Sequence, residues 1–160
     1  MQRLSQILWR ERELMEGLQY ALEVEQLILA SGRNRWLMRA ATDVESVLDT
    51  LRKTEVLRAV VADEVANTLG LGPNPSLKEL AARGGEPWGE ILGDHRDAFV
   101  KMTQAITELA DTNRDLITSG YRSARETLLA MDDGTEGYTA DGTAVLSGAG
   151  VGPSRIDRTF

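Results

Sequence analysis

The sequence has no cysteine and only one histidine among its 160 residues. Without cysteine there is no disulfide, zinc–thiolate site, iron–sulfur cluster or cysteine nucleophile. A single histidine excludes the di-iron helical bundles, which need two Glu-x-x-His pairs. Aromatic residues are also scarce, at 5% against 42% hydrophobic residues, so we expect an aliphatic core. From these residues we predict no catalytic residue, no metal site and no cofactor.

Basic residues are too few for a nucleic-acid partner. The chain has 18 Lys and Arg against 25 Asp and Glu, which gives a formal net charge of −7. Binding to phosphates or to an anionic membrane surface needs a basic surplus. Charged residues interrupt the first residues, which therefore do not form a signal peptide, and no stretch is apolar enough to span a membrane. We therefore expect a cytoplasmic protein with no nucleic-acid partner and no membrane insertion.

The spacing of apolar residues predicts helices throughout residues 1–131. Residues 1–30 repeat apolar side chains every seven positions, which is typical of a helix packed on another helix at a shallow angle. Ser31-Gly32 is a stop signal, and Asn34 is expected to cap a second helix over about 35–69. Two glycines and two prolines in residues 70–75 then break the helical pattern.

A short helix and a long helix are predicted to follow. Ser76 and Glu79 have the spacing of a capping box, which predicts a short helix over 76–83. Pro87 is expected in the first turn of a helix that runs to about Met131. The predicted fold is all-α: an elongated antiparallel bundle of three long helices with a short connecting helix. Residues 132–160 hold six of the fifteen glycines, so we expect a disordered tail and a domain organisation of 1–131 and 132–160.

Most candidate sites have a plain structural explanation. His95 is surrounded by Asp94 and Arg96 rather than by the Lys and Gly that follow the histidine of phosphotransfer modules, so we interpret it as a partly buried packing residue. The glycines of residues 148–152 do not follow a strand, as a dinucleotide-binding loop must. The acidic residues of the first helix are interpreted as ordinary helix-surface charges: Glu11, Glu13, Glu16, Glu23 and Glu25.

The late part of the last helix carries a stronger signal. Asn113 occupies a stripe position, where asparagine either fixes helix register or makes a polar contact in a partner groove. Gly120, further along, permits close backbone approach. The helix is then apolar over a wide arc that the shorter helices cannot fully cover, which indicates a binding surface, or else packing on the tail or a homodimer. This arc comprises Leu116, Ile117, Tyr121, Ala124, Leu128, Leu129 and Met131.

Four features together resemble the FlgN-type flagellar export chaperones, and the Arg/Trp-rich opening and the Gly-rich end resemble actinobacterial members. The first is the early helix rich in Leu and Glu. The second is the segment at 32–37, followed by residues 51–55. The third is the segment at 76–81, which leads to the Asn-x-x-Leu pattern at 113–116. The fourth is a tail with the pattern Tyr-x-x-x-Gly at 138–142. The resemblance covers most of the chain.

The resemblance implies a role without catalysis. A FlgN-type chaperone binds flagellar hook-associated proteins in the cytoplasm, keeps them soluble and helps deliver them to the export gate. On that basis we expect the cargo-binding residues to be Asn113, Leu116, Ile117, Tyr121, Leu128, Leu129 and Tyr138. The alternatives are another helical secretion adaptor, a coiled-coil scaffold, or histidine phosphotransfer through His95.

Overall fold

A computed structural model describes residues 1–135 of the protein, with side chains through Met131. The described residues form helices and no strand, which confirms the predicted all-α bundle with three long helices and one short helix. The last helix continues to Thr135, so the predicted start of the disordered tail at residue 132 is wrong; the rest of that tail lies outside the described residues, and the domain boundary after Met131 stays a prediction. The helices are α1 (Gln2–Ser31), the 3-10 turn η1 (Asn34–Trp36), α2 (Leu37–Leu69), α3 (Leu77–Gly84) and α4 (Trp88–Thr135).

The helix ends follow from local residue chemistry. Gly32 and Gly70 terminate α1 and α2 in the left-handed conformation, each with a φ of 67°. Glycine adopts this conformation without the steric cost of a Cβ atom. At the start of α3, the Ser76 hydroxyl accepts a hydrogen bond from the Glu79 backbone N–H, and the Glu79 carboxylate accepts one from the Ser76 backbone N–H. The predicted capping box and both predicted stops are confirmed.

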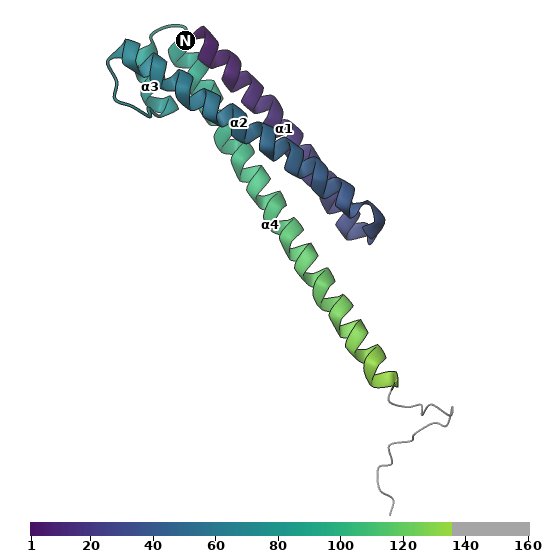
Figure 1. The fold of residues 1–160 in the computed structure, drawn as a ribbon. Coiled ribbons are helices and arrows are strands. Elements are labelled where there is room, and N and C mark those ends of the chain that lie inside the picture. The colour runs from purple at the N-terminus through teal and green to yellow at the C-terminus, as the bar shows by residue number, and fades with distance from the viewer. Residues whose placement is uncertain (136–160) are drawn as a thin grey trace, which may run out of the picture. The chain divides into compact units, whose positions relative to one another are not determined.

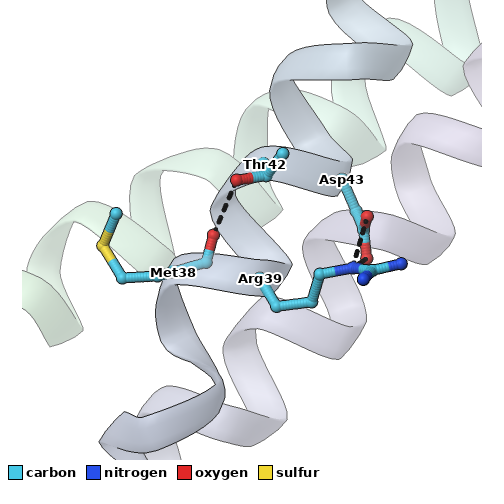
Figure 2. Close-up of polar contacts among 4 residues, drawn as sticks. All are labelled: Met38, Arg39, Thr42 and Asp43. Carbon is cyan, nitrogen blue, oxygen red and sulfur yellow. Dashed lines mark hydrogen bonds and ion pairs between the residues drawn. The ribbon is translucent and has the colours of Figure 1, made fainter.

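The start of α2 differs from the prediction. Asn34 does not cap α2, because it lies in the 3-10 turn and α2 begins at Leu37 with no side-chain cap. Figure 2 shows the polar contacts that the first turns of α2 make instead. The Thr42 hydroxyl donates to the Met38 carbonyl at 2.9 Å, and Arg39 pairs with Asp43 at 3.2 Å. These groups are exposed, so the contacts add little to stability.

The chain folds as two compact units, Met1–Ile117 and a second unit that begins at Thr118. Within the first unit α1 and α2 run antiparallel and pack along each other, and α3 lies at the end of this pair near the N-terminus (Figure 1). Its core is aliphatic, as predicted from the low aromatic content of the sequence. Burying these side chains removes apolar area from water and so stabilises the fold. The main buried cluster comprises Leu4, Leu8, Val61, Ala62, Val65, Leu80 and Leu92.

Two acidic residues of α1 are buried, which overturns their interpretation as surface charges. Glu11 is 5% exposed and Glu25 is 9% exposed. Both belong to a stripe with alternating steps of four and three residues, the spacing of a helix face packed on neighbouring helices. Because each carboxylate is charged, residue type alone predicts a side chain that is exposed to solvent. The register of the stripe instead places it in the interior of the bundle. The buried stripe is Leu4, Leu8, Glu11, Met15, Leu18, Leu22 and Glu25.

Candidate partner-binding surface

Asn113 lies inside the first unit, between α4 and α1. Its side chain is 2% exposed. Its amide nitrogen donates to the Leu22 carbonyl at 3.0 Å and to the Glu25 carboxylate at 2.9 Å. The buried Glu25 carboxylate therefore has a hydrogen-bonding partner from α4, which burial of a charged group requires. Of the two roles weighed for Asn113, this geometry matches the fixing of helix register, since a shift of α4 along α1 would separate these groups.

The next two predicted residues mark where the side chains of α4 become exposed. Leu116 is half-buried, and Ile117 is 48% exposed at the end of the first unit. From Ile117 through Met131 every side chain of α4 is exposed. The transition thus falls within one helical turn of the buried Asn113.

A stripe of apolar side chains follows this transition. Tyr121, Ala124, Leu128 and Met131 are separated by three, four and three residues, so they share one face of α4. Tyr121, Leu128 and Met131 are 71%, 67% and 65% exposed. We call these four residues the late-helix stripe. Its apolar atoms are unusual for a water-exposed helix face and have the pattern of a helix that packs on a partner.

Two other predicted residues do not belong to the late-helix stripe. Leu129 is 56% exposed but lies one residue after Leu128, about 100° around the helix. Tyr138 lies outside the described residues. The spacing of residues therefore separates Leu129 from the late-helix stripe, and the role of Tyr138 stays a prediction.

His95 is packed more deeply than predicted. Its side chain is 1% exposed, with the ring edge-on to Trp9 at 5.0 Å and stacked on Phe99 at 6.2 Å between ring centroids. Burial lowers the pKa of His95, and the nearby Arg12 guanidinium lowers it further. Neither ring nitrogen hydrogen-bonds to another described residue. The packing interpretation is confirmed, and the ring presents no exposed nitrogen to a phosphoryl donor.

Two other kinds of functional element are missing from the part of the chain that the structure describes. Within it, no group of three or more His, Cys, Asp and Glu side chains is arranged to hold a metal ion. None of the described helices combines the length and the apolar character that crossing a membrane requires.

The described residues thus form an all-α protein whose last helix leaves an amphipathic face exposed. Comparison with protein families gives a more particular assignment. The family model described as FlgN protein matches residues 1–145, which is most of the chain. The chain therefore belongs to the FlgN family, a family of cytoplasmic flagellar export chaperones that bind hook-associated proteins.

A curated relative gives a second, partial similarity. The chain is 30% identical over 128 residues to an adenylosuccinate synthetase of Parasynechococcus marenigrum (strain WH8102). The alignment covers 76% of this chain but only 28% of that protein, so the chain corresponds to little more than a quarter of its length. No solved structure matches the chain.

Proposed function

We propose that this protein acts by binding and not by catalysis, in the cytoplasm, as a chaperone for a flagellar hook-associated protein. The late-helix stripe and the segment around Tyr138 hold the cargo, prevent its premature self-association and aid its delivery to the export gate. The observation that carries this proposal is the run of exposed apolar residues on one face of α4, from Tyr121 to Met131.

The energetics of the late-helix stripe favour a helical cargo segment. Burying a large apolar side chain contributes about 1.5–3 kcal/mol. Tyr121, Leu128 and Met131 keep at least 65% of their surface in water, so most of this contribution is still available for a partner. An amphipathic cargo helix can bury these side chains along its own apolar face, as in helix-in-groove recognition. The same contact would shield the apolar face through which the cargo self-associates.

Cargo binding is tested by co-expression with the C-terminal region of a hook-associated protein from the same genome, followed by size exclusion with light scattering. A stoichiometric complex is expected. Leu128→Asp should weaken that complex by about tenfold or more, because it places a charge in an apolar contact. The matched control is Leu27→Asp on α1, since Leu27 is 69% exposed and Leu128 is 67% exposed. A complex that tolerates Leu128→Asp as well as Leu27→Asp would contradict the role of the late-helix stripe.

The tail is tested separately by ending the chain after Met131. We expect the melting temperature to stay nearly unchanged, because the buried core lies within Met1–Ile117. Cargo binding should weaken if the segment around Tyr138 takes part. Full binding by the shortened chain would remove the tail from the proposal and leave the late-helix stripe.

The same light-scattering experiment addresses the scaffold alternative. A free chain with the mass of a dimer, and with no complex formed, would indicate that the late-helix stripe is an interface between copies. A free monomer that binds none of a panel of hook-associated proteins would instead favour a different secretion adaptor.

A further inference from the structure

A second apolar surface lies within the first unit, well before the late-helix stripe. It is a groove of about 650 Å³ formed by residues of α1, α2, α3 and α4. Its apolar side chains include Leu51, Phe99 and Val100, of which Val100 is 63% exposed. The α4 residues of the groove end at Gln104, so the groove does not include the stripe from Tyr121 to Met131. We call this the α2–α4 groove.

Three charged side chains, those of Glu11, Glu55 and Arg58, lie close together in the wall of the α2–α4 groove. The Glu11 carboxylate, although buried, lies 3.1 Å from the Arg58 guanidinium. This ion pair does not have hydrogen-bond geometry, and the Oε2 atom of Glu11 has no hydrogen bond within the described residues. Burial raises the pKa of Glu11, Arg58 opposes that shift, and the neighbouring Glu55 carboxylate adds to it. Glu55 therefore places a second carboxylate close enough to affect the Glu11–Arg58 ion pair, without pairing with the guanidinium itself.

The remaining charges of the α2–α4 groove do not neutralise this cluster. Arg96 also lines the groove, but its guanidinium bonds to the Asp97 carboxylate at 2.7 Å. Glu55 is exposed and has no ion-pair partner among the described residues. Glu55 thus presents an exposed carboxylate without an ion-pair partner beside the apolar side chains of the groove.

We propose that the α2–α4 groove binds an amphipathic helix of another protein, with leucine-type side chains against Phe99 and Val100 and one lysine or arginine beside Glu55. The apolar side chains would cover surface that is now in water. The basic side chain would complete the cluster with two positive and two negative charges, and charge complementarity of this kind selects partners. This proposal is independent of the cargo role of the late-helix stripe.

The proposal is tested with a defined probe and the full-length chain. The probe is a fluorescently labelled amphipathic helical peptide with leucines at i, i+3, i+4 and i+7 and a single lysine beside them. A twin peptide has glutamate in place of the lysine. By fluorescence anisotropy, the lysine peptide should bind about fivefold more tightly than its twin, which is the scale of a partly exposed ion pair. Glu55→Lys should remove or reverse this preference.

Two matched controls separate groove binding from general surface effects. Glu45→Lys makes the same charge change at another exposed position of α2 and should keep the preference for the lysine peptide. Val100→Ser should weaken the binding of both peptides. Val56→Ser should weaken the binding of neither, since Val56 is 65% exposed but does not line the groove. None of these side chains is buried, so circular dichroism should show an unchanged fold.

Three results would overturn the proposal. One is equal binding of the two peptides, and another is a preference that persists in Glu55→Lys. The third is no saturation by either peptide up to about 1 mM. Sedimentation of the chain alone tests a second copy as the occupant. If Val100→Ser abolishes self-association of the wild-type chain, the occupant is this chain and not another protein.

Discussion

The two parts of α4 have the same helical backbone, but the first part packs against other helices and the late part is exposed to solvent. In the first part Leu92 and His95 are almost fully buried, and Asn113 bonds to α1. In the part after Ile117 every described side chain through Met131 is exposed. Packing therefore stabilises the first part, whereas the late part depends on helix propensity and its own backbone hydrogen bonds. Substitutions in the first part should affect folding, and those in the late part should affect binding.

The largest expected difference between the two parts concerns leucines. Leu92→Ala should lower the free energy of unfolding by about 2–5 kcal/mol, because Leu92 is fully buried in the first part of α4 and its loss leaves a cavity. Leu128→Ala should change it by less than about 0.5 kcal/mol, because Leu128 is 67% exposed. Urea denaturation followed by circular dichroism measures both. Comparable losses for the two variants would mean that the late helix also packs within the chain.

The next largest effect is expected at Asn113. Asn113→Ala removes two hydrogen bonds and leaves the buried Glu25 carboxylate without its amide partner, so we expect a loss of about 1–3 kcal/mol. Asn67→Ala is the matched control, because Asn67 is exposed on α2. A double-mutant cycle with Glu25→Ala measures the coupling. Additive losses would show that the Asn113–Glu25 bond contributes nothing specific.

A smaller effect is expected from the titration of His95. Burial lowers its pKa in the folded chain, so below about pH 6.5 the unfolded chain takes up a proton that the folded chain resists. The contribution of His95 to stability is therefore present above that pH and is lost as the pH falls through the folded pKa. Arg12 strengthens the effect and Asp94 opposes it.

The measurement is the melting temperature of the wild type and of His95→Phe from about pH 8 to about pH 5.5. As the pH falls, the melting temperature of the wild type should decrease relative to that of His95→Phe. Glu11 titrates in both proteins and cancels in this difference: its raised pKa favours the folded state in acid, and this benefit is lost as the pH rises through that pKa. Parallel pH profiles would show that the His95 ring is not shielded from protons.

The smallest effects are expected at two helical glycines. A Cβ atom at Gly17 or at Gly120 would meet no atom within 4 Å. Gly17→Ala should raise the free energy of unfolding by about 0.5–1 kcal/mol, because alanine favours the helix. Gly120→Ala should raise helicity by circular dichroism without moving the cooperative unfolding transition of the first unit. Because Gly17 belongs to the first unit, an equal shift from both would contradict the separation of the first unit from the late part of α4.

Local chemistry makes the helix boundaries predictable. Gly32 and Gly70 end their helices and Ser76 begins α3 through interactions with residues only a few positions away. The prediction for Asn34 is wrong because the chain enters α2 through a 3-10 turn, which the presence of a capping residue does not reveal.

The buried acids depend on information that residue type alone does not carry. Glu11 and Glu25 continue the stripe that includes Leu8, Met15 and Leu22, so their spacing is readable in the sequence. Their compensating partners, Arg58 and Asn113, are distant in the sequence and meet them only in the folded bundle. The α2–α4 groove is not predictable from the sequence for the same reason, because four helices contribute to it.

The exposure of the late part of α4 also bears on the lifetime of the chain. Arg122 and Arg125 lie within the helix where every side chain is exposed, so opening this segment breaks backbone hydrogen bonds but no buried core. Segments that open at low cost are cleaved in proportion to the time they spend open. A trypsin-like protease should therefore cut here well before the buried part of the bundle. A bound partner that closes the late-helix stripe would slow that cleavage, so the empty chain would turn over faster than the occupied one.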